Sequence, residues 1–133
     1  YGELFMNQAY VCILLAALFP LILAGLAKAG GKKLGVAYDN AAPRQSLARL
    51  AGWPQRANWA QQNSWEAFPV FAAAVLMALQ AGLPPGSVAL WAWIFVAARL
   101  AYVACYLLDL ATARSLCWVL GLGACLRLMV AAF

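Results

Sequence analysis

Polar side chains occur at helical spacing inside one of the apolar segments of the chain. Arg56, Asn63 and Glu66 are separated by seven and three residues, so a helix presents them on one face. A carboxylate at such a position accepts hydrogen bonds from an ammonium group, because its two oxygens offer about four acceptor sites. With a guanidinium nearer the surface, this face predicts a cleft for a small zwitterion that carries carboxylates.

A second segment carries a matching set. Arg99, Tyr102 and Tyr106 are separated by three and four residues and also share one helix face, and Arg114 follows them. If the two helices are antiparallel, a rise of about 1.5 Å per residue puts Glu66 about 14 Å and Tyr102 about 12 Å below the same membrane surface. The two polar faces are therefore predicted to meet. Arg114, near the water boundary, can stabilise a thiolate by lowering its pKa.

These residues also have structural interpretations. Glu66 and Arg99 can form a buried ion pair that joins the two helices, since an unpaired guanidinium at that depth is costly. Tyr106 can belong to an aromatic belt at the lipid headgroups, whereas a buried Tyr102 hydroxyl needs a polar partner. A proton-coupled exporter with Glu66 as its proton carrier is weakened by Arg99, which would hold the carboxylate ionised.

The composition indicates a membrane protein. Of 133 residues, 67% are hydrophobic and 10% charged, and the mean hydropathy is +0.81, whereas a soluble domain is about half apolar and about a quarter charged. The absence of histidine excludes imidazole-bound zinc or haem and any His-dependent catalysis. The four cysteines lie in apolar stretches without a CxxC pair, so we expect no metal site. We predict an all-α integral membrane protein with one domain, residues 1–133.

Four stretches are long enough to cross a hydrocarbon layer of roughly 30 Å. We expect transmembrane helices at residues 4–27, 54–81, 88–110 and 115–133, with a Pro-Pro-Gly turn at 84–86 between the second and the third. Together they predict a four-helix transmembrane bundle.

The first loop is expected to contain a short surface helix at residues 45–50. Its Leu47 and Leu50 would face the membrane, whereas Arg44 and Arg49 would face water.

The charges indicate the orientation of the helices. All the basic residues near the loops fall in the first and third connections: Lys28, Lys32, Lys33, Arg44, Arg49, Arg56 and Arg114. By the positive-inside rule, both connections face the cytoplasm and the termini face the other side. The net charge of +5 therefore indicates topology and attraction to lipid headgroups rather than a nucleic-acid partner.

Two motifs in these helices resemble those of a known family. The second predicted helix contains Asn-x-x-Glu-x-x-Pro, as Asn63, Glu66 and Pro69, and the third contains Arg-x-x-Tyr-x-x-x-Tyr from Arg99 to Tyr106. Both are similar to signatures of the MAPEG family, the membrane-associated proteins of eicosanoid and glutathione metabolism. The sequence of the first motif, Gln-Asn-Ser-Trp-Glu-Ala-Phe-Pro, is more similar to bacterial members of the family than to eukaryotic ones.

The resemblance implies a homotrimer of four-helix subunits in a bacterial inner membrane. Glutathione would bind between neighbouring subunits near the cytoplasmic face. By the same resemblance, Asn63 and Glu66 would hold its peptide and its γ-glutamyl amine, and Tyr102 and Tyr106 would hydrogen-bond to it.

The resemblance also assigns residues at the mouth of the cleft. Arg56 matches a basic position there, Arg114 matches the arginine that stabilises the thiolate, and Ser115 is its neighbour. Well-known eukaryotic members place an arginine four residues before the asparagine, where this chain has Trp59. One expected contact to a glutathione carboxylate is therefore missing.

Two functions follow as hypotheses. The leading one is a membrane-bound, glutathione-dependent transferase or peroxidase, in which the thiolate of this cosubstrate attacks a lipophilic electrophile or hydroperoxide. The alternative is a non-catalytic binding or scaffold protein on the same fold, possibly part of a larger membrane complex, which the missing arginine favours.

Overall fold

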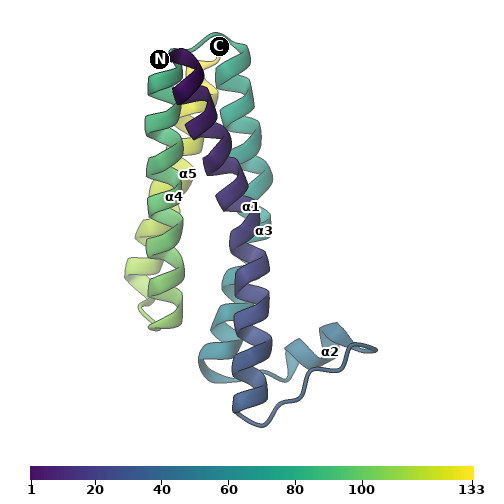
Figure 1. The fold of residues 1–133 in the computed structure, drawn as a ribbon. Helices are drawn as coiled ribbons and strands as arrows, with labels where there is room; N and C mark the ends of the chain where they lie inside the picture. Colours follow the sequence, from purple (N-terminus) through teal and green to yellow (C-terminus); the bar gives the residue numbers. More distant parts are fainter.

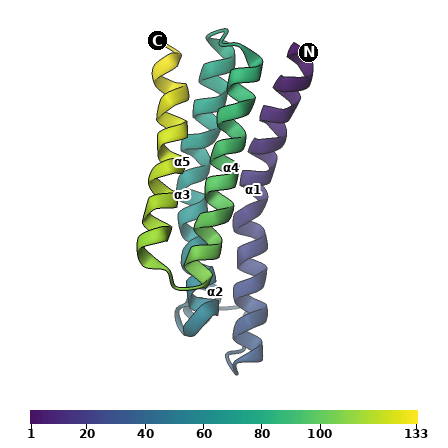
Figure 2. The same cartoon turned by 90° about the vertical axis from the view of Figure 1, so that its left-hand side faces the viewer.

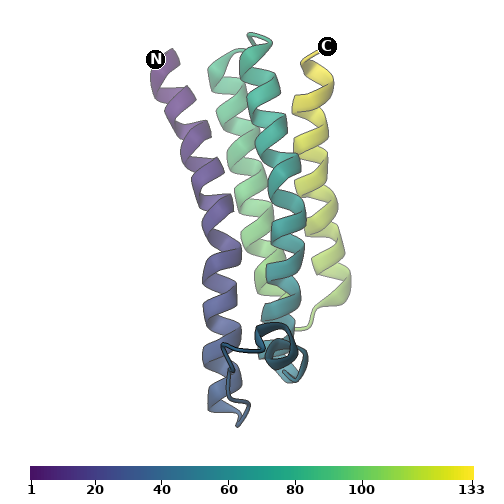
Figure 3. The ribbon, with the colours of Figure 1, turned by 90° about the vertical axis from the view of Figure 1, so that its right-hand side faces the viewer.

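The computed structural model describes residues 1–133, and its regular elements are all helices, which confirms the predicted all-α class. Four long helices lie side by side (Figure 1, Figure 2): α1 (Gly2–Lys33), α3 (Gly52–Gln80), α4 (Pro85–Leu107) and α5 (Ala111–Ala131). The short α2 (Pro43–Ala48) lies at the end opposite both termini (Figure 3). We call this the loop end, and here α1 and the start of α3 extend beyond the turn between α4 and α5 (Figure 1).

Three of the four predicted membrane spans are confirmed as helices that are long and apolar enough to cross a bilayer. These are α1, α4 and α5. Helix α3 has 29 residues, but polar side chains such as Gln61, Gln62 and Asn63 make its first half less apolar. Its crossing of the membrane therefore stays a prediction.

The helix ends differ from the predicted limits. Helix α1 continues past residue 27 to Lys33, because lysines in its last turn are favourable at the negative end of the helix dipole and do not stop a helix. Helix α4 stops at Leu107 rather than at residue 110, since Asp109 adopts a left-handed conformation with φ 60°. Helix α5 begins at Ala111, four residues earlier than predicted.

Three of the long helices end with the same backbone motif. The left-handed residues are Gly35, Gly82 and Asp109, with φ of 89°, 80° and 60°. The next N–H donates to a carbonyl five residues earlier, as from Leu110 to Cys105 at 2.8 Å. The resulting turn between α4 and α5 is only three residues long, so the first turn of α5, which contains Arg114, follows directly on the end of α4.

The first loop is held differently from the prediction. The short helix spans Pro43–Ala48 rather than 45–50, and the Leu50 side chain is buried against Ala27 and Ala57 instead of facing the membrane. Leu50 can be buried here because α1 and α3 both extend beyond the ends of α4 and α5 (Figure 1) and leave an apolar gap between them. Leu47 is half-buried beside the same cluster, whereas Arg44 and Arg49 are exposed as expected.

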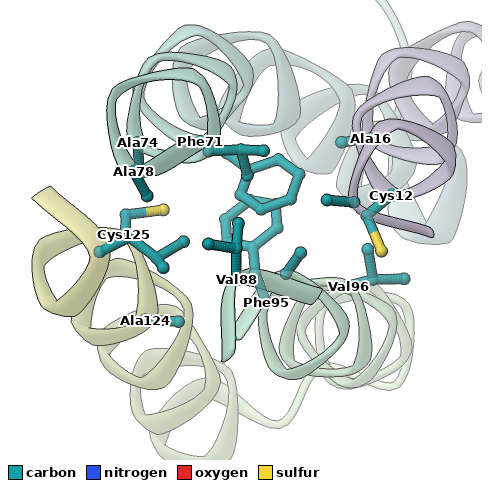
Figure 4. Close-up of a cluster of buried hydrophobic side chains, with 14 residues drawn as sticks. Cys12, Ala16, Phe71, Ala74, Ala78, Val88, Phe95, Val96, Ala124 and Cys125 are labelled. Carbon is teal, nitrogen blue, oxygen red and sulfur yellow. The ribbon is translucent and has the colours of Figure 1, made fainter. Parts of the chain in front are cut away.

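The hydrophobic core lies between the long helices in the half that contains the termini. Phe71 of α3 and Phe95 of α4 stack there with ring centroids 3.9 Å apart and planes within 6° (Figure 4). Small side chains such as Ala16, Ala74 and Ala124 surround the rings and allow the backbones to approach closely. The polar residues discussed below lie between this core and the loop end.

Gly30 tests the packing of α1 against the start of α3. A Cβ atom at this position would overlap the ring of Trp53 and lie 2.9 Å from Cγ of the buried Pro54. We expect Gly30→Ala to lower the free energy of unfolding in detergent by about 1–3 kcal/mol, because overpacking forces the two helices apart.

Gly25→Ala is the matched control. Gly25 lies in the same helix, and nothing is within 4 Å of the added Cβ atom. Its melting temperature should equal that of the wild type or exceed it slightly, since alanine favours the helix. Equal melting temperatures for the two variants would show that α1 and α3 do not pack as described.

Candidate functional site

A buried arginine connects α3 and α4. Arg99 is only 3% exposed. Its Nη1 donates to Oδ1 of Asn63 at 2.8 Å, and its Nη2 donates to Oγ of Ser64 at 3.2 Å. The Ser64 hydroxyl donates in turn to the Ala60 carbonyl at 2.7 Å. The two polar helix faces therefore meet, and successive residues of α3 supply both acceptors.

The predicted direct ion pair between Glu66 and Arg99 is not formed. The guanidinium binds Asn63 and Ser64 instead, and Nδ2 of Asn63 donates to Oε2 of Glu66 at 3.4 Å, a long hydrogen bond. The reason is the position of Glu66 on α3: its side chain is exposed, while the two shorter side chains before it reach the buried charge. The carboxylate consequently keeps acceptor capacity for a ligand.

An aromatic column continues from Arg99 toward the loop end. The Arg99 guanidinium carbon lies 4.1 Å from the centroid of the Tyr102 ring, and the Tyr102 and Tyr106 rings meet edge to face with centroids 5.6 Å apart. The Arg114 guanidinium carbon lies 4.4 Å from the Tyr106 centroid. Cations over ring faces are attracted by the ring quadrupole. The column therefore joins a buried cation of α4 to a half-buried cation of α5.

Two predicted residues at the mouth lie outside this column. Arg56 donates from Nε and Nη2 to the Leu107 carbonyl at 3.4 and 3.1 Å. It thereby satisfies a carbonyl left unpaired at the end of α4. Ser115 is exposed beside Arg114 and makes no side-chain hydrogen bond within the chain.

Two neighbours of the cluster were not predicted from the sequence. Ser64 accepts from Arg99, and the one available signal was a small hydroxyl next to Asn63. Trp59, noted only as a departure from the family pattern, lies with its ring centroid 6.4 Å from that of Tyr106. The indole thus extends the aromatic column toward α3.

A cavity of about 140 Å³ opens beside the cluster between α3, α4 and α5. Asn63, Glu66 and Arg99 form its polar part, and its other lining residues are Ala67, Val70, Phe95, Trp118, Leu122 and Cys125. Pockets for organic ligands usually measure roughly 300–1,000 Å³. One chain therefore supplies the polar groups for a tripeptide but encloses only part of the necessary volume.

The hydrogen bond between Asn63 and Arg99 can be tested by mutation. We expect Asn63→Leu to lower the free energy of unfolding by about 2 kcal/mol, because the buried guanidinium loses its closest acceptor. Denaturation of the purified protein in mixed micelles measures the change.

Gln62→Leu is the matched control for this prediction. It removes an exposed amide one residue away that does not bind Arg99, and its stability should be close to that of the wild type. If both variants lose the same stability, the buried network does not hold α3 to α4.

Comparison with known proteins extends the sequence resemblance. The model of the MAPEG family matches residues 8–133, a segment that includes Asn63, Glu66, Arg99 and Arg114. No curated protein and no solved structure matches the chain. Because the family match covers nearly the whole sequence, the protein belongs to the MAPEG family.

Proposed function

We propose that this protein is a membrane-bound enzyme that uses glutathione to conjugate lipophilic electrophiles or to reduce lipophilic hydroperoxides. The observation that carries the proposal is the continuous column from Arg99 through Tyr102 and Tyr106 to Arg114, beside a carboxylate with free acceptor sites. Membership of the MAPEG family supports it, because that family includes enzymes of glutathione metabolism.

The cluster offers groups for the amine, the peptide backbone and the thiol of glutathione. Glu66 accepts hydrogen bonds from the γ-glutamyl ammonium. Asn63, on the adjacent turn of α3, donates to the Glu66 carboxylate and holds that side chain in place. Tyr102 and Tyr106 would donate hydrogen bonds to the tripeptide from their hydroxyls. Arg114 stabilises the thiolate, because a guanidinium favours a nearby anion over the neutral thiol, with Ser115 beside it.

The proposed reaction begins with loss of the thiol proton to water. In conjugation, the sulfur forms a bond to an electrophilic carbon, and the electrons of the broken bond stay with the leaving group. In peroxide reduction, the thiolate sulfur attacks the terminal oxygen of the hydroperoxide, so that an S–O bond forms, the O–O bond breaks, and the alkoxide takes a proton from water and leaves as an alcohol. The sulfenic acid of glutathione then reacts with the thiol of a second glutathione, which gives the disulfide and water. Binding both reactants at the membrane boundary accelerates either reaction through proximity.

The volume of the site supports an assembly of several copies. A cavity of about 140 Å³ needs a second wall to enclose a tripeptide, and exposed apolar side chains such as Val70 and Trp118 rim its opening. We therefore propose a homotrimer in which a neighbouring subunit covers this opening. Glutathione and the lipophilic substrate would meet at the subunit interface.

The distribution of charge supports the orientation. Seven basic residues lie toward the loop end: Lys28, Lys32, Lys33, Arg44, Arg49, Arg56 and Arg114. The end with both termini has one acidic and one basic side chain, Glu3 and Arg127. We propose a bacterial inner-membrane protein with four spans, including α3, whose loop end faces the cytoplasm.

A scaffold role is the second candidate. Two observations favour it: Trp59 replaces an arginine expected to bind a carboxylate of glutathione, and Arg56 already binds the Leu107 carbonyl. The site then lacks two cations for the carboxylates of the tripeptide. Under this alternative, the purified protein binds no glutathione and is isolated with a larger membrane complex.

Arg114→Gln tests the catalytic step. Loss of the group that stabilises the developing charge should lower kcat for conjugation of a generic electrophile by about 10²-fold, with little change in melting temperature. The control is Arg127→Gln, which removes an exposed arginine near the other end of the same helix, 5.8 Å from the Trp91 ring. Equal activity in both variants would remove Arg114 from the mechanism.

Glu66→Gln tests the contact to the amine. Calorimetry should show about tenfold weaker binding of glutathione, because a hydrogen bond to a charged partner is lost. Glutathione acetylated at the γ-glutamyl nitrogen lacks that charge and should bind wild type and variant equally. The assignment fails if the variant weakens both ligands by the same factor.

A further inference from the structure

A small cavity lies at the junction of three helices, beside Arg99. Its volume is about 10 Å³, and α1, α3 and α4 line it with residues that include Ala16, Phe19, Ser64 and Arg99. It extends from Arg99 toward α1, whereas the cavity described above extends toward α5, and a larger one of about 680 Å³ lies at the loop end between α1, α2 and α3. A cavity of roughly 10–15 Å³ is sufficient for one water molecule.

A backbone acceptor of α1 faces this junction. Pro20 has no N–H, so the Ala16 carbonyl, four residues earlier, loses the donor that a helix normally provides. Helix α1 changes direction along its length (Figure 1), as helices do at an internal proline. Ala16 and Pro20 are both buried, and residues four apart share one helix face. The freed carbonyl therefore lies on the side of α1 that packs against other helices, where lipid supplies no donor.

Arg99 and Ser64 bring polar groups to the same cavity. A guanidinium carries five N–H groups, and α3 uses those of Nη1 and Nη2 that bind Asn63 and Ser64. The Ser64 hydroxyl accepts from Arg99 and donates to the Ala60 carbonyl, which leaves one of its two acceptor sites free. Spare donors and a spare acceptor thus lie on the walls formed by α4 and α3, opposite an acceptor of α1.

We propose that one water molecule occupies this cavity and connects α1 to the buried arginine. Its oxygen accepts a hydrogen bond from an Arg99 N–H, and its two hydrogens are donated to the Ala16 carbonyl and to Oγ of Ser64. Buried waters in proteins make about three hydrogen bonds, which is the number available here.

This water would extend the Arg99 network from two helices to three. Asn63 and Ser64 join α3 to α4 through the guanidinium, and the water adds the bend of α1 at Pro20. The remaining walls are apolar and include Phe19, Phe68 and Phe95, so they offer no competing polar side chain. The proposal concerns the packing of the helices and does not depend on glutathione as the substrate.

Transfer of NMR magnetisation from water to alanine methyl groups tests the site. The protein is labelled at its alanine methyl groups and studied in lipid nanodiscs. We expect a water cross-peak at the Ala16 methyl group, because a water in the cavity lies within a few ångströms of it. Ala74 and Ala78 are controls: both are buried in the apolar core, do not line the cavity and should show no cross-peak. A missing cross-peak at Ala16 would overturn the proposal, since the cavity would then be dry.

Pro20→Ala tests the role of the freed carbonyl. Alanine supplies the missing N–H, so the Ala16 carbonyl accepts a helix hydrogen bond and the water loses an acceptor. We expect the Ala16 cross-peak to become about fivefold weaker. The melting temperature should equal or exceed that of the wild type, because alanine is favoured inside a helix. Leu21→Ala is the matched control, since Leu21 is exposed and lies outside the cavity, and it should keep the full cross-peak.

Two results with these variants would overturn the assignment. An unchanged cross-peak in Pro20→Ala would show that no water binds the Ala16 carbonyl and that the signal comes from exchanging protons of Arg99 or Ser64. Equal losses in Pro20→Ala and Leu21→Ala would show a general disturbance of α1. Because no measurement here involves glutathione, the outcome is independent of the proposed enzyme activity.

Discussion

The burial of one guanidinium constrains much of this structure. Arg99 is removed from water in a chain with few other polar groups at that depth, and a charge in such a place must be paired or hydrogen-bonded. Asn63, Ser64 and the Tyr102 ring together meet that need. In doing so they hold α3 against α4 in one register, and the register decides which other side chains of the two helices can meet.

Helix α3 lines two different cavities because it is polar on two faces. Asn63 and Glu66 point toward the cavity shared with α4 and α5, whereas Asn58 and Gln62 line the cavity shared with α1 and α2. This double polarity is why α3 is the least apolar of the long helices. The second half of α3 contributes Phe71 to the apolar core (Figure 4), so this half of the helix is packed between its neighbours while the first half lines the cavities.

Helical spacing alone predicted the meeting of the two polar faces, because residues three, four and seven apart share a face wherever a helix forms. Spacing does not determine which of several nearby groups wins a hydrogen bond. Arg99 binds Asn63 and Ser64 rather than Glu66 for reasons of side-chain length and reach. Likewise, Arg56 turns to the end of α4, and Leu50 becomes buried because α1 and α3 extend beyond their neighbours. Such outcomes depend on the packed structure and not on the pattern of any single segment.

We propose that the column of tyrosines and arginines ends at a place where a glutathione thiolate is stabilised. A direct test is the ultraviolet absorbance of the thiolate of protein-bound glutathione, titrated against pH. In the wild type, we expect the thiol of bound glutathione to have a lower pKa than the thiol of free glutathione. Tyr106→Leu should reduce this shift, and Arg114→Gln should abolish it. An unshifted thiol pKa in the wild type, or the same downward shift in Arg114→Gln, would contradict it.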